Sequence, residues 1–264
     1  MPFTASHVAA VLPLARTPLV PSALVVGSMV PDLPLYLPFL GYPHTHSVPG
    51  VFGSNAAAGL AVLMVWHLLL VEPLYATAPR ALRRRVPRPV PISRLLTPGW
   101  PGRLVLTYAS LVIGAATHVT WDAFTHAGSW GSRHIGWLAA RHGPLHGYSW
   151  AQYASTLFGA ALVAAWLAHR WKGTPLRESV GAADPADPRH PVASALGQVA
   201  WLVPPVMGGA VAVTVAGSLL VGHGSDVRRA AYFAVTFGVS TALTATALLA
   251  IGWRCTRGLR ADSD

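Results

Sequence analysis

The sequence predicts an all-α, polytopic transmembrane helical bundle, and three observations lead to this prediction. Of the 264 residues, 53% are hydrophobic and only 11% are charged, whereas a typical soluble domain has roughly 25% charged residues. The mean hydropathy is +0.46. Several apolar runs reach the ~20 residues that a membrane-spanning helix needs. The abundance of apolar residues also excludes an intrinsically disordered chain.

Five long spans are expected, at residues 56–75, 104–125, 151–169, 197–221 and 230–253. Residues 1–55 are apolar too, but prolines interrupt them, and proline breaks helix interiors. These include Pro13, Pro18, Pro21, Pro31, Pro34 and Pro38. We therefore expect an irregular N-terminal segment of short helices or a re-entrant hairpin. Other helices must shelter this segment, because irregular backbone at membrane depth needs surrounding protein.

Composition divides the chain into three predicted parts. Residues 1–170 form an N-terminal membrane domain, which carries nearly all of the histidines. Residues 171–196 contain Asp-Pro pairs that favour turns, and they are predicted to be a cytoplasmic linker. Residues 197–264 are predicted to be a two-helix membrane hairpin with a basic cytoplasmic tail.

The basic residues predict the orientation of the chain. The net charge of +10 comes from 18 arginines and one lysine against 9 acids, and seven of the arginines lie in residues 76–103. Positively charged loops stay in the cytoplasm, so residues 126–150 are expected on the opposite side of a multi-pass cell (inner) membrane. The charge also suits contact with anionic membrane lipid, and we expect no nucleic-acid partner.

Several classes of site are excluded. A single cysteine, Cys255, rules out a disulfide framework and a cysteine-based zinc ribbon. No nucleophile-elbow motif supports a serine hydrolase, and no glycine-rich phosphate loop is present.

The sharpest candidate site is the motif HVTWDAFTH, which places His118, Asp122 and His126 at four-residue intervals. On a helix these three side chains share one face, and two imidazoles with a carboxylate are typical zinc ligands. The trio is predicted in the outer third of its span. An aspartate in a membrane helix costs about 2.5–3.5 kcal/mol, which a bound cation would offset. Alternatively, Asp122 caps a neighbouring element or hydrogen-bonds the two histidines structurally.

Three further candidates lie in the N-terminal segment. His44 and His46 alternate in the sequence PHTHS, and on an extended segment both rings could reach one ion; the alternative is that both are solvated. Asp32 lies in a proline-rich apolar run, where it is either functional or a helix N-cap after Pro31. His7 lies on a short helix for which Thr4 is a suitable N-cap.

These motifs, together with MPFTASHVAAVLPL, GSMVPDLPLYL and WAQYASTLFG, resemble an uncharacterised bacterial family of integral membrane proteins known only as a domain of unknown function. The pattern is in turn similar to inner-membrane metal-dependent hydrolases of the LexA-binding type. More distantly, HxxxDxxxH resembles the helical zinc-dependent phospholipases C. The phospholipases' further His-x-x-x-Glu pair has no counterpart in residues 127–160, and their N-terminal tryptophan is missing, so one or two ions are expected rather than three.

The resemblance implies a set of metal ligands: His7, Asp32, His46, His118, Asp122 and His126, with His44 adjacent. It also implies a zinc-type hydrolase, but it does not identify the substrate. The hypothesised reaction is hydrolysis of a phosphoester or related ester, and a lipid is a candidate substrate because the predicted site lies at the outer membrane–water boundary. Asp32 or Asp122 would be the catalytic base if it is not a ligand. The competing class is a non-catalytic membrane scaffold, or a carrier of metal ions or protons, that uses the same His/Asp cluster.

Overall fold

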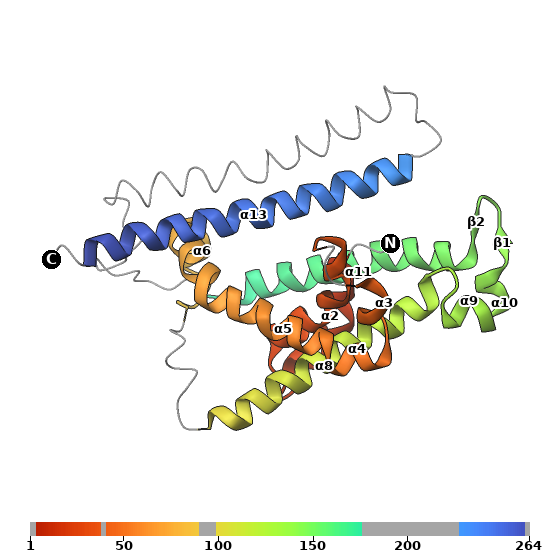
Figure 1. Ribbon diagram of the computed structural model, residues 1–264, viewed down its shortest axis with the longest axis horizontal. Helices are drawn as coiled ribbons and strands as arrows, with labels where there is room; N and C mark the ends of the chain where they lie inside the picture. The colour runs from red at the N-terminus through yellow and green to blue at the C-terminus, as the bar shows by residue number, and fades with distance from the viewer. Residues whose placement is uncertain (1–3, 38–40, 90–98, 176–226, 262–264) are drawn as a thin grey trace. The chain divides into compact units, whose positions relative to one another are not determined.

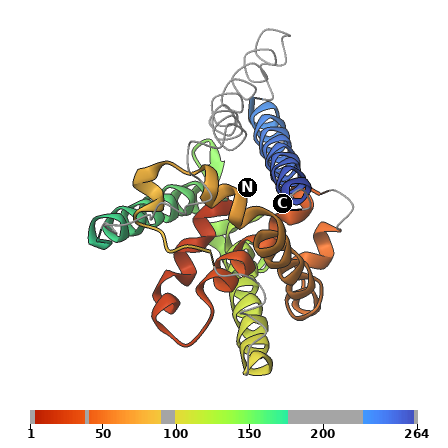
Figure 2. The same ribbon diagram turned by 90° about the vertical axis from the view of Figure 1, so that its left-hand side faces the viewer.

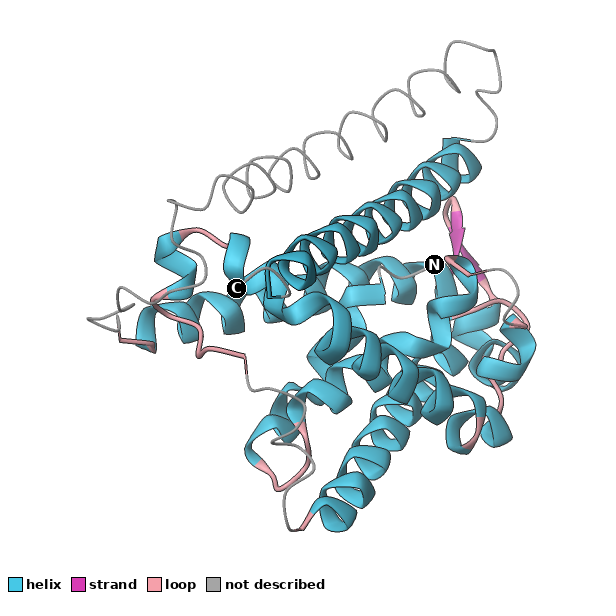
Figure 3. Cartoon of the chain, turned by 60° about the vertical axis from the view of Figure 1, so that its left-hand side comes forward, coloured by secondary structure: helices cyan, strands magenta, loops and turns pink. Residues whose placement is uncertain are grey.

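The computed structural model describes residues 4–37, 41–89, 99–175 and 227–261. The chain divides into two compact units, which we treat separately. Unit 1 comprises Met1–Leu63 and Leu95–Thr174, and unit 2 comprises Met64–Arg94 and Pro175–Asp264. The predicted helical fold is confirmed, because the strands in the described residues are two residues long each (Figure 3).

Three helical stretches of the described residues are long and apolar enough to cross a membrane: Val48–Thr77, Trp100–His134 and Gly147–Gly173. They coincide with the first three predicted spans. The fourth predicted span lies outside the described residues, as does most of the predicted linker. The fifth falls within the helix α13 (Val227–Ala261), which is not among these three.

The N-terminal segment is a series of short helices, as its prolines predict. Thr17 and Val20, which precede prolines in the sequence, are extended where helices end or begin. In chain order the elements are η1 (Thr4–His7), α1 (Val8–Val11), η2 (Leu12–Arg16), α2 (Pro21–Met29), η3 (Val30–Leu35), α3 (Tyr42–Thr45), α4 (Val48–Phe52) and α5 (Ser54–Val65).

The core of unit 1 is the packing of α2 against α8 (Trp100–Thr125) (Figure 1). Glycines allow the two backbones to approach closely: a Cβ atom at Gly114 would lie 2.5 Å from the carbonyl oxygen of Leu24 and 2.7 Å from the amide nitrogen of Ser28. Buried Leu24 and Leu111 fill the space along the contact. Since α2 leads directly into η3, this contact also positions Asp32.

A compact connection joins α8 to α11 (Gly147–Gly173). It contains α9 (Trp130–His134), α10 (Gly136–Ala139) and an antiparallel hairpin of β1 (Arg141–His142) and β2 (Leu145–His146). In the hairpin Arg141 pairs with His146 and His142 with Leu145, and Gly143 takes the positive φ of 66° that its turn requires. The two long helices meet at this connection and diverge away from it (Figures 1 and 2).

In unit 2, a π-helical turn η4 (Trp66–Leu70) precedes α6 (Val71–Thr77) and α7 (Arg80–Arg83), and α13 packs against η4 and α6. Pro73 has no N–H to offer the carbonyl of Leu69, four residues earlier. Arg254 supplies a substitute, because its Nε donates to that carbonyl oxygen over 3.3 Å. The same guanidinium lies 3.6 Å from the Glu72 carboxylate.

Candidate metal centre

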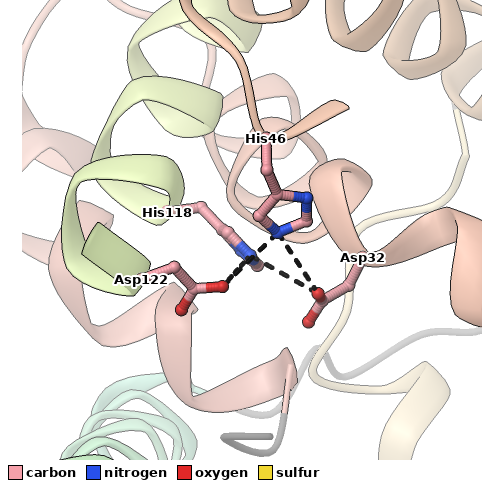
Figure 4. Close-up of side chains that lie close together, drawn as sticks. All are labelled: Asp32, His46, His118 and Asp122. Atoms are coloured by element: carbon pink, nitrogen blue, oxygen red, sulfur yellow. Dashed lines mark ion pairs between the residues drawn. The ribbon is translucent and has the colours of Figure 1, made fainter. Parts of the chain in front are cut away.

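Four side chains from three separate stretches of unit 1 meet at one point. Asp32 comes from η3, His46 follows α3 directly, and His118 and Asp122 lie one turn apart near the end of α8. Their ligand atoms all lie within 4.8 Å of one another (Figure 4). Asp32, His118 and Asp122 are buried, and the side chain of His46 is 13% exposed.

Carboxylates and imidazoles alternate around this point. The Nε2 atom of His46 lies 3.7 Å from Asp32 Oδ1 and 3.4 Å from Asp122 Oδ2. The Nε2 atom of His118 lies 3.6 Å and 3.4 Å from the same two oxygens. These four distances are close to the separations expected between nitrogen and oxygen atoms that would hold one zinc ion with bonds of about 2.0–2.2 Å.

Most of these atoms lack the hydrogen bonds that buried polar atoms normally make. Within the described residues, Nε2 of His46, Nε2 of His118 and Oδ1 of Asp32 are buried without a hydrogen-bond partner. An unsatisfied buried polar atom costs about 1–3 kcal/mol. A cation shared by all three would remove that cost, so the donor set fits a divalent metal.

The surrounding residues orient each imidazole. Nδ1 of His118 donates to the carbonyl oxygen of Ser28 over 2.8 Å, which leaves Nε2 with a lone pair. Nδ1 of His46 lies 3.3 Å from the carbonyl oxygen of Tyr42 and 3.1 Å from the Thr45 hydroxyl. That hydroxyl donates to the carbonyl oxygen of Pro31 over 2.8 Å, so it accepts from His46. Both rings therefore present Nε2 to the centre.

The carboxylate of Asp32 is held in the same way. Thr4 donates from its hydroxyl to Asp32 Oδ2 over 2.7 Å, so that Oδ1 faces the histidines. Asp32 is not an N-cap, because Met29 occupies that position of η3 and no side chain caps it. The hydroxyl of Thr4, which was predicted to cap a short helix, instead donates to Asp32.

The second oxygen of Asp122 faces two further histidines. Oδ1 lies 3.6 Å from His7 Nε2 and 3.5 Å from His126 Nδ1. The His7 ring stacks on the His118 ring with centroids 3.8 Å apart, and its buried Nε2 has no hydrogen-bond partner within the described residues. Burial lowers the pKa of His7 to about 4, so this ring is neutral at pH 7.

His126 lies beside the group of four rather than within it. Its Nδ1 is 3.3 Å from the backbone carbonyl oxygen of Asp122, and its Nε2 is 3.4 Å from the amide nitrogen of Gln152 on α11. The cause is the end of α8, because His126 is extended and leaves the helical face that it was predicted to share.

His44 lies away from the centre and is exposed. The prediction placed His44 and His46 on an extended segment, whereas the structure has the helix α3 there. Two positions along a helix turn a side chain by about 200°, so the two rings cannot face one ion.

Residues that the sequence did not single out hold the centre in place. Asn55 on α5 is 1% exposed and donates to the carbonyl oxygen of Thr45 over 2.7 Å, which anchors the turn before His46. The backbone of η1 rests on α11 at Gly159, where a Cβ atom would lie 2.7 Å from the carbonyl oxygen of Ser6. No single-sequence pattern indicates either contact, because both join segments far apart in the chain.

Fold and site together define a class of protein: a helical membrane protein with a buried His/Asp cluster that could hold a divalent metal ion. The chain belongs to the family described as "Domain of unknown function (DUF4184)", whose model matches residues 1–252. No curated protein and no solved structure matches it. The family description assigns no activity, so function has to be argued from the site.

Proposed function

We propose that this protein is a membrane-embedded, metal-dependent hydrolase. Asp32, His46, His118 and Asp122 would hold a divalent cation, with zinc as the expected metal. The substrate would be a phosphoester or related ester, such as a membrane lipid. The single observation that carries the proposal is the convergence of these four ligand atoms within 4.8 Å.

The ligand chemistry favours zinc over a hard cation. Imidazole nitrogen suits zinc, whereas calcium and magnesium prefer sites made of oxygen alone. The hydrogen bonds from His118 to Ser28 and from Thr4 to Asp32 are of the kind that orient metal ligands in advance of binding. A bound cation would act as a Lewis acid and lower the pKa of a coordinated water.

The chain itself supplies a candidate proton acceptor. Of the two aspartates expected as bases, Asp32 has its second oxygen occupied by Thr4. Asp122 Oδ1 is outside the group of four and accepts a longer hydrogen bond, over 3.5 Å, from the Thr125 hydroxyl. It lies 3.6 Å from His7 Nε2, which has no hydrogen-bond partner within the described residues. Asp122 Oδ1 is therefore the carboxylate oxygen placed to accept a proton from an attacking water, with the neutral His7 ring beside it.

The position of the site suits an amphiphilic substrate. Asp122 lies three residues before the end of α8, and the partly exposed His46 borders the centre. With the arginine-rich residues 76–103 in the cytoplasm, this end of α8 would face the extracytoplasmic side of the cell membrane. A lipid headgroup would reach the centre from there.

The test uses the full chain, purified in detergent without chelator. We expect about one or two zinc ions per chain in the wild type, and hydrolysis of phospholipid measured by chromatography of the products. The Asp122→Asn variant should lose turnover while it keeps its unfolding temperature. His44→Ala is the matched control, because His44 is exposed and outside the centre, and it should retain both metal and activity.

The possible outcomes are distinct. Absence of stoichiometric metal from the wild type would contradict the hydrolase proposal. Metal without hydrolysis of phospholipids or other phosphoesters would favour the competing class, a scaffold or carrier built on the same cluster. A fall in the unfolding temperature on chelation, with no activity to lose, would indicate a structural metal.

A further inference from the structure

The segment between α8 and α11, residues 126–146, is a packed structure rather than a loose loop; we refer to it as the connecting segment. Leu138 on its inner side is 7% exposed. A Cβ atom at Gly131 would lie 2.9 Å from the carbonyl oxygen of Ala123 and from the Cα of Phe124, at the end of α8. Contacts with the end of α8 therefore hold the connecting segment in place.

The outer side of the connecting segment is aromatic. Trp130 is 51% exposed and Trp137 is 54% exposed. Trp130 stacks on His134 with centroids 4.8 Å apart, and Trp137 stacks on His142 at 4.7 Å. Because the inner side is already packed, these indoles are not needed to fill a core. Exposed tryptophans on an ordered scaffold are typical of the membrane–water interface.

The lengths of the flanking helices place the connecting segment at one membrane surface. The 26 residues of α8 extend about 39 Å, more than the ~30 Å thickness of a hydrocarbon core. The helix can thus cross the core before the chain becomes extended at His126. The 27 residues of α11 are long enough to return. Both helices end at the connecting segment (Figure 1).

The charged residues of the connecting segment are all basic. Arg133 and Arg141 are exposed, and the sequence contains no acidic residue between Asp122 and Glu178. Arg141 donates to the carbonyl oxygens of Gly143 and Pro144, which holds its guanidinium at the tip of the hairpin. A basic surface at the headgroup level attracts anionic lipid.

We propose that the connecting segment binds the headgroups of anionic phospholipids, with Trp130 and Trp137 at the interface and Arg133 and Arg141 facing the lipid phosphates. This binding requires no metal. One consequence rests on the proposed hydrolase function: bound lipid would be at the same end of α8 as the metal centre, because the connecting segment begins at His126, whose Nδ1 lies 3.5 Å from Asp122 Oδ1.

The experiment measures contact with lipids of defined charge. Cys255, the single cysteine of the sequence, is first changed to Ser. Exposed Ala139 on α10 is then changed to Cys, and this new cysteine is labelled with an environment-sensitive fluorophore. The protein is reconstituted with brominated phosphatidylglycerol or brominated phosphatidylcholine at equal mole fraction. We expect the anionic lipid to quench at least about twofold more strongly.

Charge variants identify the responsible residues. Arg133→Gln/Arg141→Gln should make the two lipids quench equally, whereas Arg170→Gln/Lys172→Gln, at the other end of α11, should leave the preference unchanged. An unchanged unfolding temperature would show that the variants are folded. Equal quenching by both lipids in the wild type, or quenching by neither, would overturn the proposal.

The same measurement separates this proposal from the hydrolase function. Chelation of the metal should leave the lipid preference unchanged, because neither arginine belongs to the metal centre. A protein without metal or activity that still prefers anionic lipid would contradict the hydrolase function alone. Loss of the preference on chelation would contradict a metal-independent lipid surface.

Discussion

The His118 ring donates from Nδ1 to the carbonyl oxygen of Ser28 over 2.8 Å, although the two residues are 90 positions apart in the chain. This bond depends on the close approach of α2 and α8 at Gly27 and Gly114. It determines which nitrogen of His118 faces the other ligands. A contact between two backbones thus sets the chemistry of the candidate metal centre.

The contact between α2 and α8 should be sensitive to a single methyl group. Gly114→Ala would bring a Cβ atom to 2.5 Å from the carbonyl oxygen of Leu24, and we expect a loss of about 1–3 kcal/mol of stability together with weaker zinc binding. Gly102→Ala, in the same helix, meets nothing within 4 Å and serves as the control. Thermal unfolding and zinc titration measure both effects. Equal stability of the two variants would show that the helices do not pack this closely.

The hydroxyl of Thr4 should support metal binding without touching the ion. Thr4→Val removes the donor to Asp32 Oδ2, and loss of such a supporting bond typically weakens metal affinity by about 10–100-fold. Thr4→Ser should restore it. Thr107→Val, whose hydroxyl donates to the Arg103 carbonyl within α8, is the control. Competition with a fluorescent zinc chelator gives the affinities, and an unaltered affinity in Thr4→Val would contradict this role.

The two histidines of the PHTHS motif should behave differently. His46→Ala removes a ligand atom from the centre, so the purified variant should retain less zinc than the wild type. His44→Ala should retain the full amount, because His44 is exposed and outside the centre. Elemental analysis of both proteins checks the difference. Equal loss of metal from His44→Ala and His46→Ala would contradict the placement of His44 outside the metal centre.

Arg254 should stabilise unit 2 through its hydrogen bond to the Leu69 carbonyl, to which Pro73 cannot donate. Arg254→Ala removes the hydrogen bond to Leu69, and we expect a loss of about 1 kcal/mol. The partly exposed ion pair with Glu72 should add little. Cys255→Ser, at the neighbouring exposed position, is the control. The melting temperature of each variant measures the effect, and unchanged melting of Arg254→Ala would mean that solvent replaces the lost donor.

Part of the candidate site could be predicted from the sequence. The spacing of His118 and Asp122 indicates a shared helical face, and both lie on the buried side of α8. The third member of that motif, His126, is not on the shared face, because α8 ends just before it. A regular spacing in the sequence does not show where a helix ends. Likewise, the alternation of His44 and His46 does not distinguish an extended segment from the helical turn of α3.

The supporting residues could not be predicted. Each of them makes a hydrogen bond to a residue at least ten positions away. The carbonyl of Ser28 bonds to His118, the hydroxyl of Thr45 to Pro31, and the amide of Asn55 to Thr45. Such contacts leave no periodic pattern. Thr4 and Asp32 are 28 positions apart, yet their side chains are hydrogen-bonded to each other. From the local sequence alone, each was a candidate helix N-cap.

The amino-acid sequence alone determined the helical character of this chain and the helices long and apolar enough to cross a membrane, because hydropathy and helix length are local properties. It also identified the residue types capable of holding a metal. Only the tertiary structure decided which of the seven candidate ligands meet, because convergence depends on where α2 crosses α8 and where α3 turns. Those geometries are set by close glycine contacts and by hydrogen bonds between distant segments.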